Sequence, residues 1–135
     1  MTGAFERVFL RLSRFTLIGM ATTAIYAACA FLLSDRTDGI ASMPAVVASF
    51  YAYLLAGISS YIGHKYFTFA SRGTHSIELP RFILCNIVGL ALAVIFPAVL
   101  TDMFDISAAV PIVIVCIIVP VLNFIVFDRW VFRHA

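Results

Sequence analysis

The residues of this chain that could do chemistry are polar and basic side chains at or near the ends of long apolar stretches. Arginine and lysine bind phosphate oxygens through charged N–H donors, and amides and hydroxyls can hydrogen-bond the hydroxyls of a sugar. The candidates that share this chemistry are Arg14, Ser60, His64, Lys65, Arg81, Asn86, Asn123 and Arg129. As a group they are suited to binding the head group of an anionic lipid.

Each candidate also has a structural explanation. An amide inside a membrane helix can hydrogen-bond a neighbouring helix, which contributes about 0.6 to 2 kcal/mol. Basic residues beside aromatic ones anchor helix ends at the membrane surface, and Tyr66, Phe67, Phe69, Trp130 and Phe132 are placed for that role. For a single asparagine a helix contact is the simpler interpretation, whereas several polar groups at one depth favour a binding site.

Catalytic, metal and redox sites find no support in the sequence. Cys29, Cys85 and Cys116 fall inside apolar stretches without the spacing of metal ligands. There is no nucleophile with a paired base, and Asp102 and Asp105 belong to a short loop. The sequence therefore predicts no enzyme, cofactor or metal, and the absence of a continuous basic stripe predicts no nucleic-acid partner.

The elements that must position the candidate residues are transmembrane helices. Hydrophobic residues make up 63% of the 135 residues and charged residues 12%, with a mean hydropathy of +1.06. Uncharged stretches, each at least 20 residues long, cover residues 15–34, 39–64, 82–101 and 106–127. A helix of about 20 residues spans the hydrocarbon core and satisfies its own backbone hydrogen bonds. We therefore predict an all-α membrane protein with four transmembrane helices.

The basic residues predict the orientation, because Lys and Arg near helix ends are retained in the cytoplasm. Eight of the nine flank the stretches on one side, and only Arg36 lies on the other. Both termini and the loop around residues 65–81 are thus predicted to be cytoplasmic. The first apolar stretch continues past Cys29 to Leu33, which is too long for a cleaved signal peptide.

Two pairs of similar motifs indicate an internal repeat. "RFTLIG" begins at Arg14 and "RFILCN" at Arg81, while "SYIGHKYFTF" covers residues 60–69 and "NFIVFDRWVF" covers residues 123–132. Each unit contains two helices, so the two helical hairpins are predicted to form a parallel repeat about an axis along the membrane normal. We predict one membrane domain over residues 1–135, with repeats at about 14–70 and 81–135.

These motifs, in this order and spacing, resemble the GtrA-like family over essentially the full chain. The resemblance implies a multi-pass protein of the bacterial cytoplasmic membrane. Its implied role is to translocate a polyprenyl-phosphate-linked sugar, or the polyprenyl-phosphate carrier, for surface polysaccharide synthesis or modification, beside a membrane glycosyltransferase. The sequence departs from the family where Ser60 and His64 replace usual asparagines, and where Thr22 and Tyr26 replace frequent Asn and Asp. If those positions contact substrate, a different lipid or sugar is expected.

Two other functions fit a small four-span protein. A non-transporting accessory protein would anchor or stabilise a glycosyltransferase. A proton-coupled exporter would need a titratable group inside the membrane, and His64 is the only candidate because the seven acidic residues lie outside the apolar stretches. Four short helices cannot surround a large amphiphile, so a homo-oligomer or a larger partner in the bilayer is expected.

Small residues predict where the helices approach closely. They recur at every fourth position in the second and third apolar stretches, at Ala48, Ala52, Ala56 and Ser60 and at Cys85, Gly89, Ala93 and Pro97. Residues four apart share a helix face, so each series forms a narrow seam.

Overall fold

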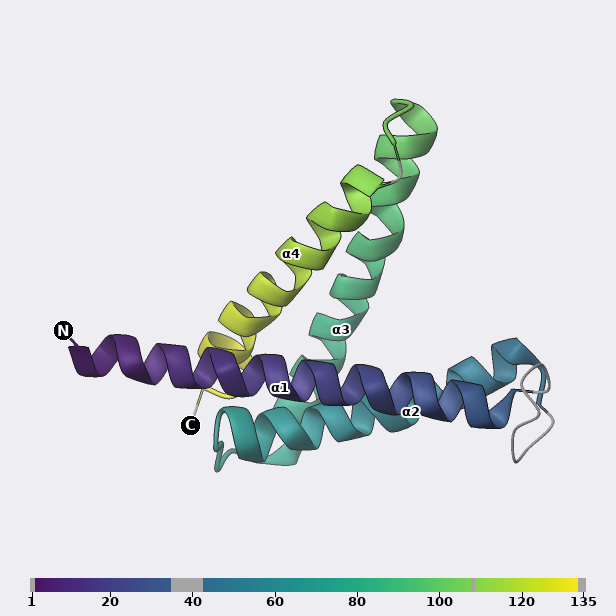
Figure 1. Ribbon diagram of the computed structural model, residues 1–135. Coiled ribbons are helices and arrows are strands. Elements are labelled where there is room, and N and C mark those ends of the chain that lie inside the picture. The colour runs from purple at the N-terminus through teal and green to yellow at the C-terminus, as the bar shows by residue number, and fades with distance from the viewer. Residues whose placement is uncertain (1, 35–42, 108, 134–135) are drawn as a thin grey trace. The chain divides into compact units, whose positions relative to one another are not determined.

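The computed structural model describes residues 2–34, 43–107 and 109–133, and apart from one β-bridge between Ser34 and Met43 its regular elements are helices (Figure 1). The α-helices are α1 (Thr2–Leu33), α2 (Ala45–Ile62), α3 (His75–Pro97) and α4 (Ala109–Val126). Three of them continue into π-helical turns, η2 (Gly63–Thr68), η3 (Ala98–Met103) and η4 (Phe127–Val131). The all-α prediction is confirmed. The predicted external loop that contains Arg36 lies outside the described residues.

Three helical stretches in the described part of the chain are long and apolar enough to cross a membrane. They are Gly3–Leu33, His75–Met103 and Ala109–Val131. Many of their large apolar side chains are exposed, among them Leu17, Ile87 and Ile117, as expected of residues that face lipid. The chain is thus a multi-pass membrane protein, and α2 as a fourth span stays a prediction.

The chain divides into two compact units, Met1–Ala70 and Ser71–Ala135. In unit 1, α1 packs along α2, and in unit 2, α3 packs against α4 (Figure 1). Helix α1 begins at Thr2, well before the predicted start of the first span near residue 15. Its first residues include Ala, Glu, Arg and Leu and no proline, so nothing in the sequence stops the helix from continuing past the membrane.

Small residues bring the helices of unit 1 together as predicted. Ala48, Ala52 and Ala56 are buried. Where α2 passes into η2, a Cβ atom on Gly63 would lie only 2.9 Å from Cδ1 and Cγ2 of Ile18. The absence of a side chain at Gly63 therefore permits the close approach of α1.

The predicted seam in unit 2 is only partly present. Cys85 is buried, and a Cβ atom on Gly89 would lie 3.3 Å from Cγ1 of Val119 on α4. Ala93 is exposed, so the predicted seam is wrong at that position. Nearer the start of α3, an aromatic contact joins Phe82 to Phe127 of η4, with ring centroids 5.1 Å apart.

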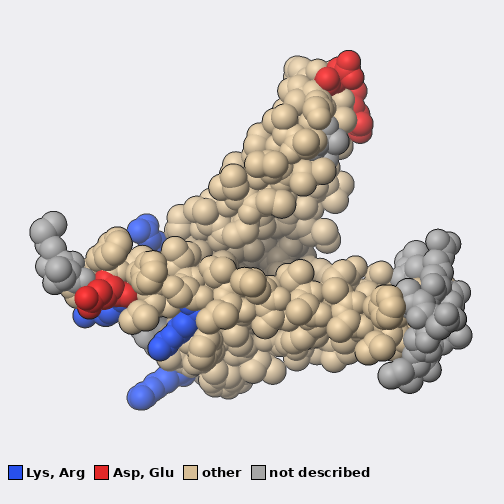
Figure 2. Space-filling model, in the orientation of Figure 1, with Lys and Arg blue, Asp and Glu red and all other residues tan. Residues whose placement is uncertain are grey.

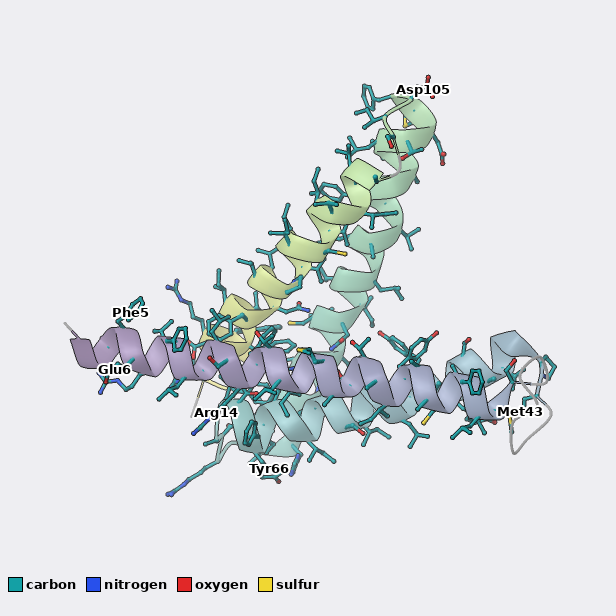
Figure 3. The ribbon with its side chains drawn as sticks, in the orientation of Figure 1. Phe5, Glu6, Arg14, Met43, Tyr66 and Asp105 are labelled. Carbon is teal, nitrogen blue, oxygen red and sulfur yellow. The ribbon has the colours of Figure 1, made fainter. Side chains whose placement is uncertain are left out.

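On the face that Figure 2 shows, the charged side chains of each unit gather toward the ends of its helical hairpin, and the rest of the described surface is uncharged. In unit 1, Arg7, Arg11 and Arg14 lie on the first half of α1. In unit 2, Asp102 and Asp105 lie at the turn between α3 and α4, where Figure 3 labels Asp105. The uncharged surfaces are those expected of helices that cross lipid.

Candidate functional site

The first candidate site lies where the end of α2 meets α1 in unit 1. The guanidinium carbon of Arg14 is 5.5 Å from the ring centroid of Phe67, which is a cation–π contact. Phe15 stacks on His64 with ring centroids 4.7 Å apart, and His64 lies 6.4 Å from Phe69. We call these five residues the Arg14 cluster. Figure 3 shows Arg14 and Tyr66 toward one end of the hairpin and Met43 at the other.

The π-helical turn η2 positions the side chains of this cluster. The N–H of Phe69 donates to the carbonyl oxygen of His64 at 2.9 Å, a bond that spans five residues and widens the turn. His64 Nδ1 lies 3.2 Å from Thr68 Oγ1, and both side chains are buried. Tyr66 and Phe67 point outward, with 57% and 49% of their surface exposed. The turn therefore buries a polar pair and presents two aromatic rings.

A corresponding cluster lies where α3 meets the end of α4 in unit 2. The guanidinium carbon of Arg81 is 5.2 Å from the ring centroid of Trp130, and Arg81 Nη1 donates to the Trp130 carbonyl oxygen at 2.8 Å. Phe82 contacts Phe127 at 5.1 Å between ring centroids, and Phe127 lies 5.9 Å from Phe132. We call these five residues the Arg81 cluster.

The two clusters have the same pattern of contacts. In each, an arginine of the opening motif lies over an aromatic ring of the closing motif, and the phenylalanine after that arginine packs on the first ring of the π turn. In unit 1 the carbonyl oxygen of His64 accepts a hydrogen bond of 2.9 Å from the N–H of Phe69. In unit 2 the carbonyl oxygen of Phe127 accepts one of 2.9 Å from the N–H of Phe132. The motifs that the sequence analysis paired thus form equivalent local structures.

Four of the eight predicted site residues lie in unit 1. Arg14 and His64 both belong to the Arg14 cluster, and Arg14 is exposed whereas His64 is buried. Lys65 is also buried, with its Nζ 5.8 Å from the ring centroid of Tyr66. Ser60 is half-buried on α2, one turn before η2. The unit therefore brings two of its four predicted residues into one cluster.

The other four predicted residues lie in unit 2. Arg81 belongs to the Arg81 cluster, and Arg129 is exposed on η4. Asn86 Nδ2 donates to the carbonyl oxygen of Phe82 at 2.8 Å, within its own helix, and Asn123 is half-buried on α4. The hydrogen bond of Asn86 supports a structural role for one of its amide donors. A single site formed by all eight residues stays a prediction.

Sequence reasoning missed several residues that build the clusters. It interpreted Phe67 and Trp130 as anchors in the aromatic belt, and it gave no role to Phe15, Phe82 or Thr68. A signal for two of them was present, because a phenylalanine follows the arginine in both opening motifs. The contact of each phenylalanine with a π turn depends on tertiary structure.

The described residues offer no site for a metal ion. They contain no group of three or more His, Cys, Asp or Glu side chains that could hold one. Cys29, Cys85 and Cys116 are free thiols, and their surroundings range from buried to exposed.

Comparison with known proteins places both clusters within one family domain. No curated protein and no solved structure matches the chain. The sequence profile described as "GtrA/DPMS, transmembrane domain" matches residues 14–132, which run from Arg14 of the first cluster to Phe132 of the second. That match covers most of the 135 residues. The chain therefore belongs to the GtrA/DPMS transmembrane domain family.

Proposed function

We propose that this protein translocates a polyprenyl-phosphate-linked sugar, or the polyprenyl-phosphate carrier itself, across the bacterial cytoplasmic membrane. The sugar would serve surface polysaccharide synthesis or modification, and a membrane glycosyltransferase would make the lipid-linked sugar. The protein would not itself catalyse a reaction. Family membership supports this proposal, because the family is associated with polysaccharide and glycan synthesis and its small proteins are generally non-catalytic.

The observation that carries the proposal is the exposed guanidinium of Arg14, which is held against the Phe67 ring in unit 1. A guanidinium can bind two phosphate oxygens at once, and an aromatic face can stack on a sugar ring. Both groups lie next to long apolar helices that suit a polyprenyl tail. An amphiphile with a phosphate, a sugar and a long hydrocarbon chain matches these three features.

We also infer that the two units form a parallel repeat of helical hairpins with both termini in the cytoplasm. The equivalent contacts of the two clusters support a repeat, because each unit uses the same motif pair for the same local structure. The eight-to-one distribution of basic residues supports the orientation.

Transfer between leaflets tests the proposed function directly. Purified protein would be reconstituted into liposomes whose inner leaflet alone contains a fluorescent polyprenyl-phosphate sugar, and a membrane-impermeant quencher would report its arrival outside. We expect transfer to rise with the protein-to-lipid ratio, and protein-free liposomes to retain the label. Transfer no faster than in protein-free liposomes would contradict the proposal. Stabilisation of a co-expressed glycosyltransferase without transfer would support the accessory role.

A further inference from the structure

The Arg14 and Arg81 clusters share their contacts but differ in chemical character. The ring that packs on the phenylalanine after the cluster arginine is His64 in unit 1 and Phe127 in unit 2. The next residue is Lys65 in unit 1 and Asp128 in unit 2. The buried Thr68, which pairs with His64, is replaced in unit 2 by the buried Val131. At these three positions unit 1 therefore has two polar side chains and a positive charge where unit 2 has two apolar side chains and a carboxylate. At the position after Lys65, Tyr66 of unit 1 is replaced by Arg129 of unit 2.

The Arg81 guanidinium is bound by its own unit. It lies over the Trp130 ring and donates to the Trp130 carbonyl oxygen at 2.8 Å. This hydrogen bond joins the start of α3 to η4, two segments far apart in the sequence. Phe82, Phe127 and Phe132 are buried beside it. The cluster thus has the features of a structural contact between two helix ends.

The Arg14 guanidinium has a different environment. Within the described part of the chain, its contact is the one with the Phe67 ring. Arg14 is exposed, and so are Phe67 and the adjacent Tyr66. A cation–π contact uses the positive charge of the guanidinium and does not require its N–H donors, so these donors can still bind phosphate oxygens in pairs.

We propose that the phosphate of a lipid ligand binds to Arg14 in unit 1, and that the Arg81 cluster is its structural counterpart in unit 2. This inference rests on the proposed function and adds the place at which the ligand phosphate binds. The exposed rings of Tyr66 and Phe67 lie beside the phosphate, where they can stack on an attached sugar. At the Arg81 cluster the guanidinium already donates to the Trp130 carbonyl oxygen, which leaves fewer of its N–H donors for a phosphate.

Matched exchanges of the two arginines test this inference. Full-length protein in phosphatidylcholine nanodiscs would be titrated with a fluorescent short-chain polyprenyl phosphate. We expect Arg14→Lys to weaken binding about tenfold or more, as for the loss of one charge-assisted hydrogen bond. Arg81→Lys should bind within about twofold of wild type but should unfold at a lower temperature, because an ammonium cannot keep both contacts of the guanidinium. Arg133→Lys serves as a control for exposed arginines outside both clusters.

Photochemical cross-linking gives a readout that does not depend on the stability of a variant. A photoactivatable polyprenyl phosphate bound to wild-type protein should label peptides of unit 1 that contain Tyr66 and Phe67. Labelling centred on Trp130, or equal losses of affinity in Arg14→Lys and Arg81→Lys, would overturn this inference while leaving the proposed function intact. Absence of binding to wild-type protein would overturn both.

Competition separates a ligand site from a general attraction to anionic lipid. Phosphatidylglycerol also carries a phosphate but lacks the polyprenyl chain. We expect a tenfold excess of phosphatidylglycerol to leave most of the bound polyprenyl phosphate in place. Displacement at equal concentrations would show that Arg14 only anchors the helix to the membrane surface, and would overturn the inference.

Discussion

At the scale of single residues, aromatic contacts are common to the two units and hydrogen-bonding capacity distinguishes them. His64 and Phe127 both pack on the phenylalanine that follows the cluster arginine. Only His64 has a polar partner in the turn, Thr68, at 3.2 Å. A buried hydroxyl without a partner costs about 1 to 3 kcal/mol, so this pair is expected to be coupled.

Exchange of the buried pair tests that coupling. His64→Phe keeps a ring against Phe15 but leaves the Thr68 hydroxyl without the hydrogen bond, so we expect a loss of about 1 to 2 kcal/mol in unfolding free energy. The double variant His64→Phe with Thr68→Val reproduces the Phe and Val of unit 2 and should recover part of that stability. Thermal unfolding in detergent measures both effects. Additive losses in the double variant would show that the two side chains are independent.

The loop before α3 depends on a glycine. Ser71 Oγ donates to the buried carboxylate of Glu78, and the Gly73 N–H donates to Ser71 Oγ at 3.2 Å. A Cβ atom on Gly73 would overlap the Glu78 carboxylate. We expect Gly73→Ala to break this arrangement and lower stability by about 1 to 3 kcal/mol, since a buried polar group loses its partner. Arg72→Ala, at the exposed neighbour, should have little effect in the same thermal assay.

At the scale of helices, the apolar stretches predicted the existence of the helices better than their ends. A run of apolar residues reports what faces lipid, so α3 and α4 could be predicted from composition. The same run does not report where a helix continues into water, and α1 therefore begins earlier than predicted. The π turns were also missed, because they are defined by backbone hydrogen bonds between residues five apart, such as Phe69 to His64, and the composition of a stretch does not show these bonds.

The contact between α1 and the end of α2 predicts different effects at two glycines. Alanine at Gly63 would place its Cβ 2.9 Å from Ile18, whereas Gly57 has open space around it. We expect Gly63→Ala to cost about 1 to 3 kcal/mol through overpacking. Gly57→Ala should be neutral or stabilise by about 0.5 to 1 kcal/mol through its helix propensity. Denaturant titration in detergent would measure both changes.

A second variant identifies the cause of the Gly63 effect. Ile18→Ala removes the atoms that the new methyl group would meet, so the double variant should be more stable than the sum of the two single losses predicts. Strict additivity would assign the Gly63→Ala loss to the backbone and not to the contact with α1.

At the scale of the whole molecule, membrane location and family could be predicted from the sequence, whereas the meeting faces of the helices could not. The hydropathy of a segment and the position of its basic residues reflect how that segment lies in the bilayer, and they do not depend on which helices are in contact. Helix contacts in lipid carry no hydrophobic signal, because lipid is as apolar as the side chains. Sequence patterns therefore suggested a seam at Ala93, which is exposed, and gave no role to Phe15 or Phe82, which are in the clusters.

Energy coupling separates lipid translocation from proton-coupled export. We expect transfer of the polyprenyl-phosphate sugar to follow the gradient of the lipid itself, made in one leaflet and consumed in the other. A protonophore should therefore leave the initial rate in liposomes unchanged within about twofold. A proton-coupled step would require a titratable group in the membrane, and the seven acidic residues lie outside the predicted apolar stretches. A rate that collapses with the proton gradient, and that is also lost in His64→Ala, would favour the exporter.

Topology is the prediction that concerns the whole chain. Single cysteines would be placed at Thr74 and Ser107, in a background without the three native cysteines. Both positions are exposed, and α3 and η3, from His75 to Met103, lie between them. The distribution of basic residues predicts that Thr74 is cytoplasmic and that Ser107 is outside. An impermeant maleimide added to intact cells should thus label Ser107→Cys alone, and Thr74→Cys only after the membrane is opened.

A cysteine at Thr37, in the first predicted external loop, should behave like the one at Ser107. Labelling of Thr74→Cys in intact cells would contradict the predicted orientation, and opposite behaviour of Thr37→Cys and Ser107→Cys would contradict the pairing of the units as parallel hairpins.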